Sequence, residues 1–291
     1  MSHRPRTASE SGHRARSGGL SARIVAGLAV AGLVLIASGS AASSPGAEAR
    51  TVAGEADIGV LFVDGVGAEH NCTASVIRSR TRDVVLTAAH CVNGTGLGIQ
   101  FVPGYVQGSA PHGVWDVTAA YVDPRWVSSQ DPQYDFAFLI VAAHHSGGRS
   151  VRLGDVVAGN RLGPAPRPGQ ELQVTTYANE PDADAISCTA VTYLHAGYPA
   201  FDCDGYAAGT SGAPWLTAEV VTPGHPVRQP VRHPAPREPV VSGVIGGLEQ
   251  GGCIESTSYS SRFDSDTFTV FERAVAGRSP DTLPVSRDAD C

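Results

Sequence analysis

Beyond residue 50, short apolar runs alternate with stretches rich in glycine, proline and polar residues. The runs recur at intervals of roughly 8–12 residues, which is typical of β-sandwiches and β-barrels. A helical pattern occurs at 267–276, where Phe268, Phe271 and Val275 fall on one face. The pattern therefore predicts an all-β fold with a helix near its C-terminal end. The predicted strands are 58–63, 73–77, 84–87, 98–102, 114–122, 136–141, 171–177, 187–194, 213–216 and 240–245.

Two segments interrupt this pattern. Residues 146–168 are rich in glycine, arginine and proline, and we expect them to connect two β units. Residues 223–239 contain six prolines. Because proline has no backbone N–H group to donate, this segment should be an exposed, extended loop. The order of the strands fits two β-barrels.

Charge is unevenly distributed along the 291 residues. The net charge is −7, but residues 1–49 carry five arginines and two glutamates, which is +3 and leaves −10 for the remainder. An apolar stretch follows at 24–37, shorter than the roughly 20 residues that span a bilayer and typical of a signal peptide. We predict a leader at 1–49, cleaved after Ala42 or at Ala47-Glu48-Ala49, and a secreted protein without a membrane contact. The alternative is that this stretch stays as a membrane anchor.

Composition narrows the chemistry further. All 21 basic residues are arginines, so the chain has no lysine. This excludes mechanisms that need a lysine amine, namely Schiff bases, Ser-Lys dyads and Walker A loops. An acidic body without basic clusters argues against binding of nucleic acid. The six cysteines all follow the leader, and an even number in an exported chain suggests disulfides. Motifs typical of zinc sites are missing, so no metal site is predicted.

Three short passages carry candidate chemistry. They read Leu-Thr-Ala-Ala-His-Cys at 86–91, Tyr-Asp-Phe-Ala-Phe-Leu at 134–139 and Gly-Thr-Ser-Gly-Ala-Pro at 209–214. A serine hydroxyl is a poor nucleophile at neutral pH and needs a base within hydrogen-bond reach. Histidine can exchange a proton near neutral pH, and an aspartate can orient its ring. Each passage alone is common, but the three together predict a catalytic triad.

In this order the passages resemble the trypsin/chymotrypsin-like serine peptidases over roughly residues 55–275, and in particular secreted actinobacterial trypsin-like peptidases. The resemblance implies two six-stranded antiparallel Greek-key β-barrels with a C-terminal helix. The peptidase domain would be 50–276, with an N-terminal barrel at about 55–145 and a C-terminal barrel at about 166–265. Residues 277–291 would form a tail.

The resemblance also implies a role for each residue of the motifs. His90 would be the general base, Asp135 would orient its ring, and Ser211 would be the nucleophile. The backbone N–H groups of Gly209 and Ser211 would form the oxyanion hole. Gly212 would leave space for the substrate carbonyl.

Substrate selection depends on how the loops are aligned with the family. By count, Gly205 stands where trypsin has an aspartate that binds basic side chains, although a shifted alignment would place Asp204 there. We expect Ile245, Gly246 and Gly247 to offer backbone groups to an extended substrate and to leave the pocket open. These assignments slightly favour substrates with small or apolar side chains.

The family bridges the positions of Cys72 and Cys91, so a disulfide is predicted there. Cys188 and Cys203 bracket a short hairpin-like segment and form the second predicted pair. Cys253 and Cys291 then follow by elimination. The family cysteine that Cys253 resembles usually joins the nucleophile loop, but alanine occupies the expected partner position at 207.

Activation is expected to differ from that of trypsin. Arg50 and Thr51 resemble a cleavage site for activation. In trypsin the new N-terminus pairs with an aspartate just before the nucleophile, but here that position is Thr210. A threonine cannot neutralise a buried ammonium group, and an unpaired buried charge costs several kcal/mol. We therefore expect that activity does not need a free amine at Thr51.

The sequence thus predicts a secreted serine endopeptidase that hydrolyses protein or peptide substrates through an acyl-enzyme, without a cofactor and as a monomer. The alternative is a peptidase-like fold that acts as a binding or adhesion module with little turnover. An esterase of the α/β-hydrolase class fits poorly, because the order of the triad and the motif around the serine both differ.

Overall fold

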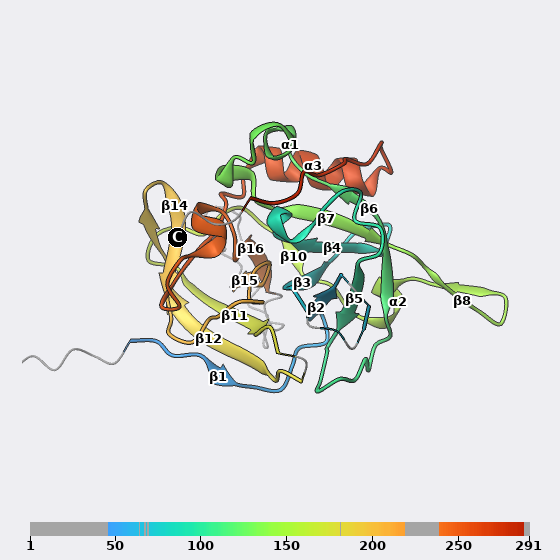
Figure 1. Ribbon diagram of the computed structural model, residues 1–291, viewed down its shortest axis with the longest axis horizontal. Coiled ribbons are helices and arrows are strands. Elements are labelled where there is room, and N and C mark those ends of the chain that lie inside the picture. The colour runs from blue at the N-terminus through green and yellow to red at the C-terminus, as the bar shows by residue number, and fades with distance from the viewer. Residues whose placement is uncertain are drawn as a thin grey trace, which may run out of the picture. The chain divides into compact units, whose positions relative to one another are not determined.

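The computed structural model describes residues 46–287, apart from 64, 67, 69, 181 and 219–238. The predicted signal core and nearly all of the proline-rich loop lie outside these residues. None of the helices in the described part of the chain has the length and apolar character needed to cross a membrane. The described residues form an all-β fold with short helices, as the sequence predicts (Figure 1).

The first half of the chain closes a six-stranded antiparallel barrel in the order β2-β3-β4-β7-β6-β5. Successive side chains of a strand point to opposite faces. In β4, Val85 packs inside the barrel, whereas Val84 and Leu86 pack outside it with residues of the second half. Both faces are buried, which explains the unbroken apolar runs. The strands are β2 Ile58–Phe62, β3 Cys72–Ile77, β4 Val84–Thr87, β5 Gln100–Pro103, β6 Trp115–Tyr121 and β7 Ala137–Val141.

The second half contains a six-stranded sheet in the order β1-β12-β11-β15-β16-β10 and a three-stranded sheet in the order β13-β14-β17. One pairing departs from the antiparallel prediction, because β10 runs parallel to β16. The strands are β1 Arg50–Thr51, β10 Arg161–Leu162, β11 Glu171–Tyr177, β12 Ala185–Val191, β13 Tyr193–His195, β14 Tyr198–Asp202, β15 Pro214–Thr217, β16 Val240–Val244 and β17 Thr257–Tyr259.

The remaining elements connect the strands or cover them. The C-terminal helix α3 packs against β6 and β7 of the first barrel (Figure 1). Val275 is buried and Phe271 packs against the core, as predicted, whereas Phe268 is only partly covered and Val270 and Ala274 complete the buried face. The helices are α1 Pro124–Ser129, α2 Leu153–Val156 and α3 Ser265–Val275, the 3-10 turns are η1 Ala89–Cys91, η2 Pro132–Tyr134 and η3 Leu248–Gly251, and a hairpin joins β8 His144–Ser146 to β9 Arg149–Val151.

One histidine outside the predicted triad is fully buried. The ring of His70 lies among the aromatic rings of Phe62, Tyr105 and Tyr177, with centroid separations of 6.0 to 6.4 Å. In the described part of the chain, neither ring nitrogen has a hydrogen-bond partner. Burial lowers the pKa of His70 to about 4, and the nearby backbone of Glu180 opposes this effect.

This burial should make the fold sensitive to acid. The neutral ring is favoured in the folded state, so its stabilising contribution is complete above pH 6.5 and is lost as the pH falls toward 4. Between pH 6.5 and pH 4, the unfolding free energy of the parent protein should therefore fall by roughly 2–3 kcal/mol more than that of His70→Leu. Denaturant unfolding at several pH values measures the difference. His145→Asn, at an exposed position, should follow the parent curve, and parallel curves for His70→Leu would contradict the prediction.

Candidate active site

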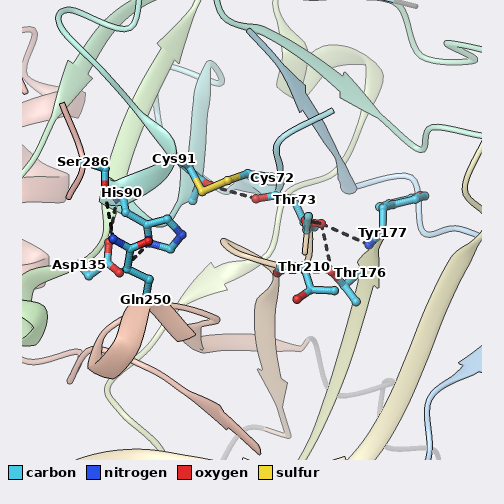
Figure 2. The surroundings of a disulfide bond; sticks show 12 residues. Cys72, Thr73, His90, Cys91, Asp135, Thr176, Tyr177, Thr210, Gln250 and Ser286 are labelled. Atoms are coloured by element: carbon cyan, nitrogen blue, oxygen red, sulfur yellow. Dashed lines mark hydrogen bonds and ion pairs between the residues drawn. A yellow bond between two sulfur atoms is a disulfide. The ribbon is translucent and has the colours of Figure 1, made fainter. Parts of the chain in front are cut away.

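The carboxylate of Asp135 joins three separate segments of the chain. It accepts hydrogen bonds from His90 Nδ1 at 2.8 Å and from the His90 backbone N–H at 2.9 Å (Figure 2). The Gly247 backbone N–H donates a third, at 2.8 Å. Asp135 is completely buried, and the His90 side chain is 8% exposed. The structure therefore brings together two members of the predicted triad and fixes the histidine ring through Nδ1.

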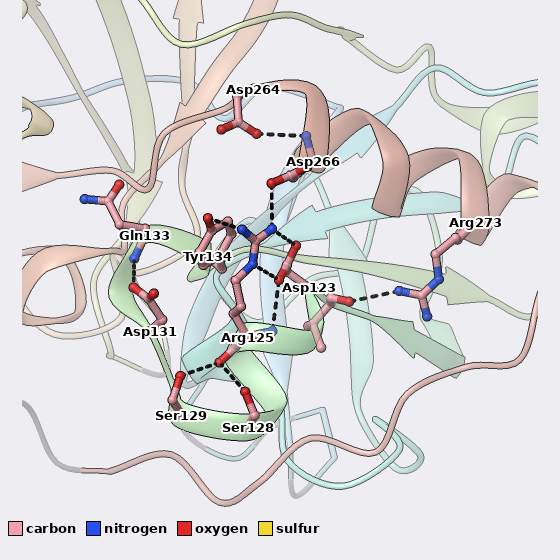
Figure 3. Close-up of polar contacts among 11 residues, drawn as sticks. Asp123, Arg125, Ser128, Ser129, Asp131, Gln133, Tyr134, Asp264, Asp266 and Arg273 are labelled. Atoms are coloured by element: carbon pink, nitrogen blue, oxygen red, sulfur yellow. Dashed lines mark hydrogen bonds and ion pairs between the residues drawn. The ribbon is translucent and has the colours of Figure 1, made fainter.

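The turn that precedes Asp135 is held in place by Arg125. The Arg125 guanidinium lies 3.6 Å from the centroid of the Tyr134 ring and donates a hydrogen bond to its hydroxyl. The same guanidinium bonds Asp123 at 2.7 and 2.8 Å and Asp266 of α3 at 2.6 Å (Figure 3). Because Tyr134 directly precedes Asp135, these contacts connect the position of the carboxylate to α1 and α3.

A disulfide lies directly beside the histidine. Cys72 and Cys91 are joined, with a Cα–Cα distance of 6.1 Å, and Cys91 follows His90 in the 3-10 turn η1 (Figure 2). Thr73 follows Cys72, and its backbone N–H donates to the carbonyl of Ser211 at 2.8 Å. A continuous set of short-range links therefore connects the turn that carries the histidine to the loop that carries the serine.

The serine loop depends on two glycines with positive φ. Gly209 has φ +91°, and a Cβ atom there would lie 2.5 Å from the backbone nitrogen of Asn179. Gly212 has φ +82°, and a Cβ atom would lie 2.1 Å from Thr87 Oγ1 and 2.2 Å from Thr73 O. The missing side chain of Gly212 therefore lets the serine loop contact the first barrel, while the space it was predicted to leave for the substrate carbonyl stays a prediction.

Ser211 Oγ and His90 Nε2 are not hydrogen-bonded in the described structure, although both residues lie at the same junction between the two halves. Such contacts are often long in unliganded enzymes and shorten in the substrate complex. Thr210, which precedes the serine, is buried, and its hydroxyl donates to the carbonyl of Ala207 at 2.8 Å. The polar group at this position is therefore satisfied within its own loop.

A cavity of about 280 Å³ opens beside Ser211. Ile245 lines it, and Gly246 and Gly247 lie against Asp135; that these three residues offer backbone groups to a substrate stays a prediction. Among the residues that line this cavity, Glu255 carries a carboxylate, and Glu255 is exposed. The further lining residues are Tyr206, Ala207, Ala208, Thr210, Gln250, Gly251, Gly252, Cys253, Ile254, Thr257 and Ser258.

The residues considered for selecting basic side chains lie elsewhere. The backbone of Asp204 bonds the N-terminal segment, through the carbonyl of Ala47 and the N–H of Ala49, both at 2.9 Å. Neither Gly205 nor Asp204 lines the cavity beside Ser211. The shifted alignment that would place Asp204 in the pocket therefore finds no support, and a preference for small or apolar side chains stays our prediction.

The second disulfide joins Cys188 and Cys203, with a Cα–Cα distance of 6.6 Å. It connects β12 to the end of β14, so the serine loop follows directly from a cross-linked strand. Cys291 lies outside the described residues, and the pairing of Cys253 with Cys291 stays a prediction.

Several contacts at the site were not predictable from motifs. The backbone N–H of Gly247, the backbone of Thr73 and the Arg125 cluster act through position rather than through a recognisable residue pattern. The side-chain amide of Gln250 is another example, because it bonds Ser286 Oγ at 3.2 Å near the predicted triad (Figure 2). These contacts result from the order of the strands, and no local sequence motif predicts them.

Comparison with known proteins identifies the family of the chain. The sequence model of the trypsin family matches residues 46–217, more than half of the chain. The chain therefore belongs to the trypsin family, and we describe it as a serine-type endopeptidase of that family. No curated protein matches the sequence.

Solved structures of similar fold include two proteases and an endopeptidase. The protease Anisep from Arthrobacter nicotinovorans has 22% identity and a TM-score of 0.60, covering 78% of this chain and 99% of that one. The thermostable serine protease AL20 from an extremophilic microorganism has 19% identity and a TM-score of 0.58, covering 76% and 98%. A Glu endopeptidase in complex with MPD has 16% identity and a TM-score of 0.55, covering 79% and 97%. These likenesses show a shared fold.

The contact at Gly212 leads to a test. We expect Gly212→Ala to lower the unfolding free energy by about 3 kcal/mol, from positive φ and from overpacking against Thr87 and Thr73. The displaced serine loop should lower kcat/KM by roughly 10²-fold or more. Gly169→Ala is the matched control, because Gly169 has a similar φ of +83° but open space around its Cβ position. It should cost about 1 kcal/mol and leave kcat/KM unchanged, and equal effects of the two variants would refute the packing argument.

Proposed function

We propose that this protein is a secreted endopeptidase that cleaves protein or peptide substrates through an acyl-enzyme, with His90, Asp135 and Ser211 as its triad. The observation that carries the proposal is the buried Asp135 carboxylate, which holds His90 through both Nδ1 and the backbone N–H. With Nδ1 fixed in this way, Nε2 is the nitrogen available to accept the proton of Ser211. The cavity beside Ser211 supplies space for a substrate side chain.

In the proposed reaction, Ser211 Oγ attacks the carbonyl carbon of the scissile bond while His90 Nε2 takes the hydroxyl proton. The N–H groups of Gly209 and Ser211 stabilise the negative oxygen that develops. Collapse of this intermediate breaks the C–N bond, and His90 donates its proton to the leaving amine. Water, with His90 again as base, then hydrolyses the acyl-enzyme and restores Ser211.

An extracellular location is supported by two disulfides in the described residues, since such bonds persist in oxidising compartments. The Cys72–Cys91 bond closes a loop with a sequence separation of 19 residues and stabilises the fold by about 3 kcal/mol in the chain-entropy model. Because this bond adjoins His90, its reduction would release the turn that carries the proposed general base.

The proposal is tested by labelling the purified protein with a fluorophosphonate, which reacts with activated serines. We expect one label per chain, lost in Ser211→Ala and retained in Ser150→Ala, where the substituted serine is exposed on the hairpin. A peptide substrate should be cleaved by the parent protein and by Ser150→Ala. A folded parent protein that takes up no label and cleaves no peptide would instead support the binding-module alternative.

Activation without a new N-terminus is supported by the first strand. Arg50 and Thr51 pair with β12, and the N–H of Val52 bonds the carbonyl of Ala185 at 2.8 Å. Insertion of an amine at Thr51 would break these bonds, and Thr210 offers it no carboxylate.

We therefore expect Arg50→Gln, which removes the basic cleavage position, to keep the kcat/KM of the parent protein. N-terminal sequencing of both preparations shows whether the chain has been cut after residue 50. An Arg50→Gln protein that is inactive, when a parent sample cut at this position is active, would show that activation by cleavage operates.

A further inference from the structure

The side chain of Thr73 lies buried behind the serine loop. Thr73 belongs to β3 of the first barrel and has no exposed surface. Its hydroxyl donates to the carbonyl of Gly209 at 3.1 Å, and its backbone N–H donates to the carbonyl of Ser211 at 2.8 Å. Thr73 therefore bonds the peptide groups on both sides of the one that joins Thr210 to Ser211.

A second buried threonine determines the direction in which the Thr73 hydroxyl donates. The hydroxyl of Thr176 in β11 lies 3.0 Å from that of Thr73, and the Tyr177 backbone N–H donates to the same Thr73 oxygen at 3.2 Å (Figure 2). A hydroxyl has one proton and two lone pairs. With Tyr177 and Thr176 as donors, both lone pairs of Thr73 are used, and its proton is left for Gly209. The contact of Thr176 Oγ1 with the carbonyl of Thr210 is longer, at 3.4 Å.

These bonds orient the backbone groups that are proposed as the oxyanion hole. The C=O and N–H of a planar trans peptide group point in opposite directions. The carbonyl of Ala208 accepts a hydrogen bond from the Asn179 N–H at 2.8 Å, so the Gly209 N–H in the same peptide group points away from Asn179. The Ser211 N–H belongs to the peptide group that lies between the two bonded by Thr73. Both proposed donors are therefore directed by contacts at the back of the loop.

Thr73 is also connected to the strand that leads to the histidine. Its carbonyl accepts a hydrogen bond from Thr87 Oγ1 at 2.9 Å, and Thr87 ends β4, three residues before His90. Thr73, Thr87 and Thr176 are all fully buried. Because water does not compete for their hydroxyl groups, a lost partner at this position is not replaced by solvent.

Resting on the proposed function, we infer that Thr73 is a positioning residue whose hydroxyl, oriented by Thr176, holds the backbone of 209–211 so that its N–H groups stabilise the oxyanion. Thr73 does not line the described cavity beside Ser211. Donors that act on charge developing in the transition state affect kcat more than KM, so removal of the hydroxyl should do the same. These anchors need no new N-terminus, which agrees with the activation proposed above.

The experiment removes the hydroxyl but keeps the shape of the side chain in the full chain. Thr73→Val retains the backbone bond to Ser211, and Thr73→Ser retains the hydroxyl. The matched control is Thr192→Val, because Thr192 is also buried and its hydroxyl bonds the backbone carbonyls of Arg167 at 2.7 Å and Gln170 at 3.1 Å. A peptide anilide gives kcat and KM with slow acylation, so that KM reports substrate binding. A peptide aldehyde, whose adduct with serine places an oxygen in the oxyanion hole, gives a second measurement.

For Thr73→Val we expect kcat to fall roughly tenfold to 10²-fold with little change in KM. This is less than the loss of a whole oxyanion donor, because the N–H groups remain present but less well directed. The Ki of the aldehyde should rise by a similar factor. Thr73→Ser should recover most of the loss. Thr192→Val should keep the kcat and KM of the parent protein, although its unfolding midpoint in denaturant falls as that of Thr73→Val does.

Three results would each overturn the inference: an unchanged kcat in folded Thr73→Val, an equal loss in Thr73→Ser, or a rise in KM that accounts for the whole loss of kcat/KM. If Thr73→Val does not fold, Thr176→Val decides the question. It should lower kcat roughly threefold with KM unchanged, the size expected when one neutral hydrogen bond is weakened, and an unchanged kcat overturns the inference. Fluorophosphonate labelling of the parent protein is read separately, because its failure refutes the proposed triad itself.

Discussion

The architecture of the site depends on one buried carboxylate. Asp135 has no contact with water, so its oxygens must be satisfied by the protein, and the donors come from the turn after β4 and from the segment after β16. A buried carboxylate with missing donors would be costly. Burial of Asp135 therefore requires that both halves of the chain be correctly assembled, and the same requirement fixes the histidine ring. Arg125 extends this constraint outward, because it packs on Tyr134 and bonds α3.

The serine loop is attached to the first barrel by a different kind of constraint, which is close approach of main chains. Thr73 bonds the Ser211 carbonyl, and Gly212 fits where a methyl group would overlap Thr73 and Thr87. The side-chain contact at Asp135 and the main-chain contact at Thr73 are two separate contacts between the halves. Together they hold elements that are 121 residues apart, from His90 to Ser211, without a covalent bond between the two halves in the described residues.

Much of the fold could be predicted because short apolar runs separated by turn residues mark strands that are largely buried. Strands such as Val84–Thr87 and Glu171–Tyr177 agree with the prediction to the residue. The short strand Arg50–Thr51 is exposed and carries no apolar pattern, and Tyr198–Asp202 contains a proline, so neither was predicted. The pairing of His90 with Asp135 could be expected from the sequence because the proposed chemistry requires these residue types. The contacts of Gly247 and Gln250 could not, since any residue has a backbone N–H and glutamine is common on surfaces.

The contacts of residues 47–49 have a consequence for where the predicted leader can be removed. Glu48 and Ala49 lie along Asp204, and Ala47 and Ala49 pack against the apolar cluster that contains Cys188 and Cys203. A leader peptidase acting at the Ala47-Glu48-Ala49 pattern would remove these residues and leave the backbone N–H and carbonyl of Asp204 without these partners. Removal after Ala42 would keep these residues in place. For the predicted leader, the fold thus favours cleavage after Ala42 over cleavage at Ala47-Glu48-Ala49.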